Sequence, residues 1–238
     1  MRILIASLPR SGSTMLFRAI SGLPHKKTTP KDNPYCAFVR DLTNIPNKPF
    51  LKTHSPAPNK LPADIRVIYI FGDPIKAIIS TKNKRWNKDS WIKNNWFHDQ
   101  EPDIFNKDDL GLEKNFDSWI TQHNYSVLAV RFESLWLNKN ILSKYLGFNF
   151  KLPKQQKRTT HPDLYLQNHL ELVYDSLSSK TKNIDDLLLI NSNKILKNPS
   201  YEDIPNTPKW TSSIMQTIRL KAWYHEKTKR NSRSLINF

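Results

Sequence analysis

Residues 8–16 (LPRSGSTML) gather one cation and three hydroxyls around a single glycine. A glycine permits a tight turn, and a turn that leads into a helix presents its backbone N–H groups at the helix N-terminus, where an anion is favoured. An arginine beside such a turn can hold two oxygens of a phosphate or sulfate. We therefore predict an anion site here, the alternative being a polar turn that binds nothing. Its candidate residues are Arg10, Ser11, Gly12, Ser13 and Thr14.

Two further side chains with chemical potential are Lys52 and His54, in the segment 50–54 (FLKTH). If this segment is a strand, the two side chains share one face because they lie two residues apart. His54, with an ordinary pKa of about 6.5, can take a proton from an attacking hydroxyl at neutral pH. Lys52 can neutralise the charge that develops on a leaving oxygen. The alternative is an exposed, polar strand end.

A third candidate segment, residues 67–80 (VIYIFGDPIKAIIS), runs from an apolar strand through a turn into a helix. Asp73 is a favourable N-cap and Pro74 a favourable first helical residue, so we expect a helix from Pro74 to about residue 86. Helical spacing then places several polar residues along one stripe. The stripe carries Lys76, Ser80 and Lys84, with Arg85 next to it. These residues could supply charge and hydroxyls to an anion, or they could form a solvated basic face.

The elements that must position these residues are four apolar runs, each short, rich in β-branched or aromatic residues and bounded by turn residues. They cover residues 3–6, 50–54, 66–71 and 126–132. Helical patterns are expected over residues 15–20, 74–86, 110–123 and 133–145. This alternation predicts an α/β fold, a three-layer sandwich with a central parallel sheet.

The domain organisation is expected to be simple. We predict a single domain over residues 1–238, with an α/β core over 1–150 and a mainly helical extension over 151–238. In that extension, residues 164–196 are expected to be helical, and residues 211–229 to form a basic helix.

Composition limits the classes of partner. Lys and Arg number 37 against 21 Asp and Glu, for a formal net charge of +16, which favours an anionic partner such as a nucleotide, an anionic glycan, nucleic acid or a membrane surface. A single cysteine, Cys36, excludes an intrachain disulfide and a cysteine-based metal site. We see neither a signal peptide nor an apolar run near the ~18 residues that span a membrane, so we expect a cytoplasmic protein without a membrane span.

Taken in order, the segments 8–16, 50–56, 67–80 and 127–135 resemble the sulfotransferase family. Its members move a sulfuryl group from 3′-phosphoadenosine-5′-phosphosulfate (PAPS) to a hydroxyl or amine and leave 3′,5′-adenosine bisphosphate (PAP). The resemblance implies a P-loop nucleotide-hydrolase-like fold, with the 5′-phosphosulfate on the first segment and the 3′-phosphate on the third. It implies His54 as general base, Lys52 and Arg10 as the residues that stabilise the departing phosphate, and no metal.

The resemblance departs from the family pattern at two positions. Gly72 stands where the family has an arginine that binds the 3′-phosphate, although Ser80 matches. Lys76, Lys84 or Arg85 could supply the missing charge. Met15 stands where the cytosolic branch commonly has a tryptophan near the adenine, so the base must stack elsewhere.

Three function classes remain open. The first is a PAPS-dependent sulfotransferase that acts on a hydroxyl-bearing acceptor such as a glycan or a small molecule. The aromatic residues Trp86, Trp91, Trp96 and Phe97 are candidates to line its acceptor pocket. The second is a kinase-like phosphotransferase, although residues 8–16 lack the lysine that follows the glycine in a Walker A loop. The third is a catalytically degenerate protein on the same fold that binds an anion or nucleic acid through phosphate contacts and stacking.

Overall fold

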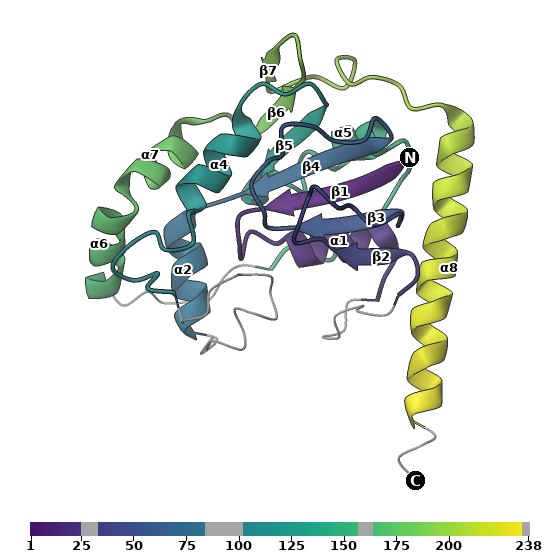
Figure 1. Ribbon diagram of the computed structural model, residues 1–238, viewed down its shortest axis with the longest axis horizontal. Helices are drawn as coiled ribbons and strands as arrows, with labels where there is room; N and C mark the ends of the chain where they lie inside the picture. The colour runs from purple at the N-terminus through teal and green to yellow at the C-terminus, as the bar shows by residue number, and fades with distance from the viewer. Residues whose placement is uncertain (25–32, 84–101, 157–163, 235–238) are drawn as a thin grey trace.

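In the computed structural model, which describes residues 1–24, 33–83, 102–156 and 164–234, a seven-stranded sheet forms the middle of the molecule (Figure 1). Its strands lie in the order β2-β3-β1-β4-β5-β6-β7. They are β1 (Arg2–Ser7), β2 (Cys36–Phe38), β3 (Phe50–Thr53), β4 (Ile65–Phe71), β5 (Val127–Arg131), β6 (Leu187–Ile190) and β7 (Ile195–Lys197).

The sheet is mixed rather than parallel throughout. Neighbours among β1 to β5 are parallel, whereas β6 runs antiparallel to β5 and β7 antiparallel to β6. The α/β fold is therefore confirmed. The expectation of a parallel sheet holds for five strands and is wrong for β6 and β7.

Helices cover both faces of the sheet (Figure 1). One face packs against α2 (Pro74–Asn83), α4 (Leu112–Ile120), α6 (Leu164–Val173) and α7 (Asp175–Asn183). The other packs against α1 (Ser13–Ser21) and α5 (Lys139–Leu146), and α8 (Lys209–Ser234) stands beside the sheet and packs against α1. Because both faces are covered, the strands are apolar on both sides, which is why they appear in the sequence as continuous apolar runs rather than as alternating ones.

The strands β6 and β7 correct the prediction of helix over residues 164–196. Residues 164–183 do form α6 and α7, but residues 187–197 form a hairpin, closed by a hydrogen bond from the Asn191 N–H to the Lys194 carbonyl (3.1 Å). The four consecutive apolar residues of β6 are buried. A run this short fits a buried strand and a buried helical turn equally well by periodicity, so the sheet that accepts it as an additional strand decides its structure.

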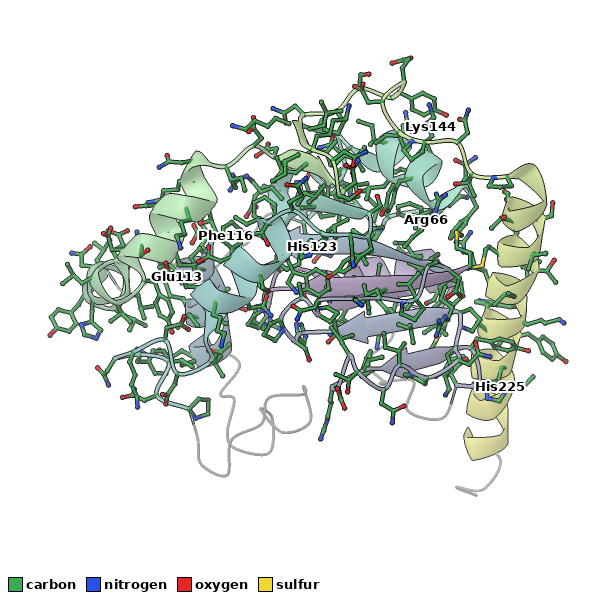
Figure 2. All side chains as sticks on the ribbon, turned by 45° about the horizontal axis from the view of Figure 1, so that its top comes forward. Arg66, Glu113, Phe116, His123, Lys144 and His225 are labelled. Carbon is green, nitrogen blue, oxygen red and sulfur yellow. The ribbon has the colours of Figure 1, made fainter. Side chains whose placement is uncertain are left out.

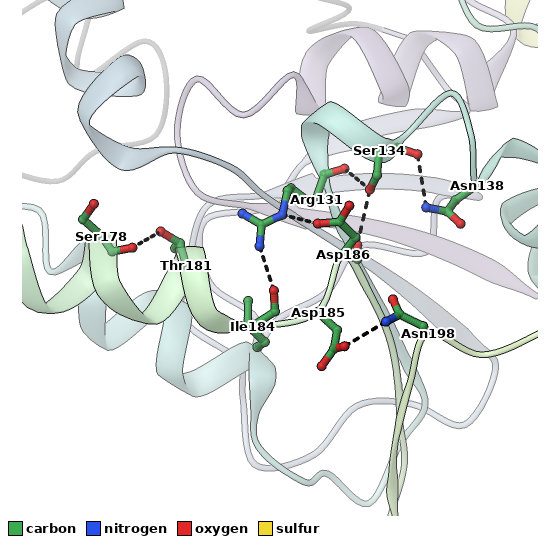
Figure 3. A network of polar contacts seen from close by, with 9 residues as sticks. All are labelled: Arg131, Ser134, Asn138, Ser178, Thr181, Ile184, Asp185, Asp186 and Asn198. Carbon is green, nitrogen blue, oxygen red and sulfur yellow. Dashed lines mark hydrogen bonds and ion pairs between the residues drawn. The ribbon is translucent and has the colours of Figure 1, made fainter.

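A polar network fixes this hairpin to the end of β5 (Figure 3). Arg131 forms an ion pair with Asp186 and donates a hydrogen bond to the Ile184 carbonyl at 2.7 Å. Ser134 donates to the Arg131 carbonyl at 3.1 Å, in the short 3₁₀ turn η1 (Phe132–Ser134) that follows β5. The predicted helix over residues 133–145 is thus divided into η1 and α5. The network holds Phe132 at the same sheet edge as the first loop.

The helix α2 begins as expected. The Asp73 side chain accepts a hydrogen bond from the Lys76 N–H at 3.0 Å, and the Asp73 carbonyl accepts one from the Ala77 N–H at 3.1 Å. These contacts confirm Asp73 as the N-cap. The described helix reaches Asn83; the predicted end near residue 86 lies outside the described residues.

An aromatic core joins α4 to the sheet. Phe116, labelled on α4 in Figure 2, lies edge-on to Phe71 with ring centroids 5.5 Å apart. Trp119 stacks on Tyr69 at 5.7 Å. Large buried rings of this kind dominate core energetics, so α4 is held firmly beside the strand ends.

The basic helix expected over residues 211–229 is confirmed and extends over 209–234 as α8. Arg219 anchors it, donating to the carbonyls of Ala19 (3.1 Å) and Asn149 (2.7 Å) and lying over the Phe148 ring. Among the helices of the described part of the chain, none has the length and apolar character needed to cross a membrane.

Candidate functional site

The candidate residues gather where β3, β1 and β4 end. These three strands are adjacent and parallel, so the loops that leave their carboxyl ends meet at one edge of the sheet. After β1 the chain first forms β2 and β3 on one side and then β4 and β5 on the other. The connections therefore diverge beside β1, and such a switch point is where open α/β sheets bind ligands.

The loop after β1 depends on its glycine. Gly12 has φ +79°, and a Cβ there would come within 2.2 Å of the Phe132 ring, so any side chain would be excluded by both conformation and space. Arg10 also has a positive φ, +60°, a conformation that costs energy for a residue with a side chain. Because the N-cap of α1 is a glycine, no side chain caps the helix. Its first N–H groups remain available to an anion.

The hydroxyls of this loop are not equally placed. Ser11 and Ser13 are buried, whereas Thr14 is exposed on the first turn of α1. Backbone N–H groups and Arg10 are therefore the main donors that the loop offers, and Thr14 is the hydroxyl that solvent reaches most easily.

Arg10 and Ser80 are brought together although they lie 70 residues apart in the sequence. The guanidinium donates to the Ser80 hydroxyl from Nη2 at 2.9 Å and from Nε at 3.3 Å. This contact brings the start of the first candidate segment and the end of the third to the same place. The sequence pattern predicts both residues as anion ligands, and they are neighbours in space.

The basic residues on α2 are less well placed. Lys76 is exposed and forms an ion pair with Asp73 at 3.0 Å, on the first turn of the helix. The structure therefore does not bring Lys76 to the Arg10–Ser80 contact. Lys84 and Arg85 lie outside the described residues, as do Trp86, Trp91, Trp96 and Phe97.

Lys52 and His54 share one face of β3 and its extension, as predicted, and they contact each other directly. Lys52 Nζ lies 2.8 Å from His54 Nε2. His54 Nδ1 lies 3.0 Å from the Ser7 carbonyl oxygen, an acceptor, so Nδ1 carries the proton and Nε2 accepts from Lys52. Both side chains are buried, with 4% and 7% of their surface exposed. The alternative of an exposed strand end is therefore wrong.

The electrostatics of this pair favour the uncharged forms. Burial, then the charges of Arg10 and Arg18, lower the pKa of Lys52 to about 7. Burial and the charge of Lys52 lower the pKa of His54 well below its ordinary value, while the hydrogen bond to the Ser7 carbonyl acts in the opposite sense. Lys52 therefore holds its proton much less firmly than an exposed lysine does. A bound anion would shift Lys52 toward its charged form.

Three residues that contribute to the site are not among the predicted site residues. Arg18 lies one turn after Thr14 on α1, and that helical spacing is a signal that could have identified it. Asn115 and Trp119 of α4 hold the chain after β3, donating to the carbonyls of His54 (2.7 Å) and Ser55 (2.9 Å). No local pattern indicates these two, because they come from an element 61 and 64 residues away.

Gly72, at the end of β4, has room for a Cβ atom. A Cβ on Gly72 would lie 3.4 Å from Phe132 Cβ and 3.5 Å from a Glu133 carboxylate oxygen, which are ordinary contact distances. Gly72 is thus not required by space, in contrast to Gly12.

The described residues contain no group of three or more His, Cys, Asp or Glu side chains that could hold a metal ion. No family model matches the chain, and a search of curated proteins finds no match.

Proposed function

We propose that this chain is a PAPS-dependent sulfotransferase with a P-loop nucleotide-hydrolase-like fold, which transfers a sulfuryl group to a hydroxyl or amine. The observation that carries the proposal is the meeting of Arg10, Ser80 and the buried Lys52–His54 pair at one sheet edge. Three separate sequence segments converge there, each of which resembles a segment of that family. The acceptor is a hydroxyl-bearing glycan or small molecule, and the protein is cytoplasmic.

The anion-binding residues fit a donor with two phosphate groups. In this proposal the N–H groups at the start of α1 and the Arg10 guanidinium hold the 5′-phosphosulfate. Ser80 faces the 3′-phosphate through its hydroxyl. The positive charges of Arg10 and Arg18, which after burial are the next causes of the lowered pKa of Lys52, attract both groups before any contact forms.

The proton transfer is assigned to the Lys52–His54 pair. The acceptor oxygen attacks sulfur as the bond from sulfur to the phosphate oxygen breaks, and PAP leaves. Lys52 turns from His54 Nε2 to the departing phosphate oxygen, which releases the Nε2 lone pair to take the acceptor's proton. The negative charge of the donor raises the pKa of both groups, which strengthens the base when the donor is bound.

The kinase-like alternative has less support. Its Mg²⁺ requires a carboxylate at a strand end, and the candidate at the end of β4 is Asp73. That carboxylate caps α2 and pairs with Lys76. The third alternative, a catalytically degenerate protein that binds an anion or nucleic acid, would use the same site residues. Experiment distinguishes it from the enzyme.

The first test compares thermal stability with PAP, with ADP and with ADP plus Mg²⁺. A ligand that binds only the folded state raises the melting temperature by mass action. We expect PAP to give a larger shift than ADP at equal concentration, followed by sulfuryl transfer from PAPS that His54→Ala abolishes. A shift with ADP and Mg²⁺ alone would contradict the sulfotransferase and favour the kinase-like function, whereas no shift with any nucleotide would point to a lost cofactor site and a binding role.

A second prediction concerns Gly72, the position where the sulfotransferase family has an arginine. Gly72→Arg should tighten PAP binding by about 10- to 100-fold, because a hydrogen bond to a charged group contributes about 1.5–3 kcal/mol, and should leave ADP binding nearly unchanged. Isothermal titration with the two nucleotides measures both. Gly72→Gln is the matched control, since it adds a polar, hydrogen-bonding side chain without charge. Equal tightening for PAP and ADP would contradict recognition of the 3′-phosphate at this position.

A further inference from the structure

Within the part of the chain that the structure describes, one side of α8 is left uncovered and carries large apolar groups. Met215 and Ala222 are buried in the core cluster that also contains α1. Leu220, Trp223 and Tyr224 lie on the remaining sides of the helix and are 68%, 41% and 64% exposed. We call Leu220, Lys221, Trp223, Tyr224 and Lys227 the outer face of α8. Side chains of this size rarely stand together in water without a partner.

Cations are interleaved with these apolar groups. Lys221 and Lys227 are exposed, and Lys227 Nζ lies 4.8 Å above the centre of the Trp223 ring. A shallow groove of about 620 Å³ runs between the outer face and Tyr35. The C-terminal end of α8 projects beyond the sheet (Figure 1).

We propose that the outer face of α8 docks on an anionic membrane surface, with the helix lying in the plane of the headgroups. Aromatic and aliphatic side chains enter the boundary between headgroups and acyl chains, where tryptophan and tyrosine are favoured. Lys221 and Lys227 keep their ammonium groups among the lipid phosphates, and each basic residue near such a surface adds attraction. This inference does not depend on the proposed enzymatic activity.

Charge complementarity distinguishes this partner from two others. A second copy of the chain would place Lys221 and Lys227 against the same lysines, because a two-fold interface brings identical surfaces together. A nucleic acid would use the cations and rings but would gain little from Leu220, the most exposed apolar residue of the face. An anionic lipid surface is the partner that satisfies the aliphatic, aromatic and cationic groups together.

The test is co-sedimentation of the full chain with lipid vesicles at about 0.1 M salt. One set of vesicles is phosphatidylcholine alone, and the other also contains roughly 30% phosphatidylserine. We expect binding to the anionic vesicles only. Lys221→Glu/Lys227→Glu should weaken it by at least about 30-fold, from roughly one kcal/mol per basic residue. Leu220→Ser/Trp223→Ser should also weaken vesicle binding, although this variant keeps the net charge of the wild type.

Matched controls are available elsewhere on the surface. Lys182→Glu/Lys194→Glu changes the net charge by the same amount at exposed positions of α7 and the β6–β7 turn, and Leu172→Ser removes an apolar residue that is 81% exposed on α6. These variants should keep vesicle binding, and all variants should keep the helical circular dichroism signal and the melting temperature of the wild type. Equal losses in the controls, absence of vesicle binding, or α8-dependent binding of single-stranded RNA in its place would each overturn the proposal.

Discussion

Arg10→Ala is expected to abolish nearly all of the stabilisation that PAP gives. Removing one partner of a charge-assisted contact costs about 2–5 kcal/mol, and a loss in the lower part of that range, about 2.7 kcal/mol, is roughly 100-fold in affinity. With PAP at 100 times the wild-type Kd, the wild type gains about 2.7 kcal/mol of stability. A variant that binds about 100-fold more weakly gains only about 0.4 kcal/mol at the same concentration. For a chain of this size the shift in melting temperature should therefore fall from about 5–10 °C to about 1–2 °C.

The reason for so large an effect is the position of the guanidinium. Arg10 stands between the anion loop and α2, and its contact with Ser80 joins the two segments assigned to the two phosphates. The matched control is Arg2→Ala, which removes an arginine that pairs with Asp64 at the other end of β1. Both variants lose one positive charge, so their net charges are the same. A PAP response that survives in Arg10→Ala, or that is lost equally in Arg2→Ala, would place the phosphates elsewhere.

Local sequence patterns predict the elements that frame the site, because a strand, a turn and a helix start each depend on residues close together in the sequence. The β1 strand, the turn at Gly12 and the start of α1 follow from an apolar run, a glycine and a helical repeat within about twenty residues. Asp73 acts as an N-cap through its own neighbours. In contrast, the β6–β7 hairpin depends on whether β5 offers an edge to pair with, which is a property of the assembled sheet.

The chemistry of the site also depends partly on local sequence and partly on the assembled sheet. A period of two places Lys52 and His54 on one face, and that much is visible in the sequence. Their burial, and the lowered pKa of Lys52, arise because β3 lies beside β1 and beneath α1, which brings Arg10 and Arg18 close. No spacing rule reports the order of strands in a sheet. The contributions of Arg18, Asn115 and Trp119 follow from that order and from the packing of α4.

Lys52→Met is expected to stabilise the free protein at neutral pH while it abolishes the response to PAP. The pKa of Lys52 is about 7 in the folded chain and about 10.5 in the unfolded chain, so the unfolded chain binds more protons between these values. In the wild type this residue therefore makes the free energy of unfolding increase as the pH rises from about 7 to 10.5. From pH 7 to 9 that increase amounts to about 2 kcal/mol, which the variant lacks.

Denaturant unfolding of wild type and Lys52→Met at pH 7 and pH 9 measures the effect directly. The variant's advantage in free energy of unfolding should be largest at pH 7 and should shrink by about 2 kcal/mol at pH 9. Lys60→Met, at an exposed position in the loop between β3 and β4, controls for the loss of one surface charge. Because only the difference between the two pH values is compared, any change in packing from the substitution cancels. An advantage that stays constant with pH would contradict a lowered Lys52 pKa. A variant that still responds to PAP would remove Lys52 from the anion site. If both expectations hold, the chain holds a destabilising, buried lysine for the sake of the anion it binds.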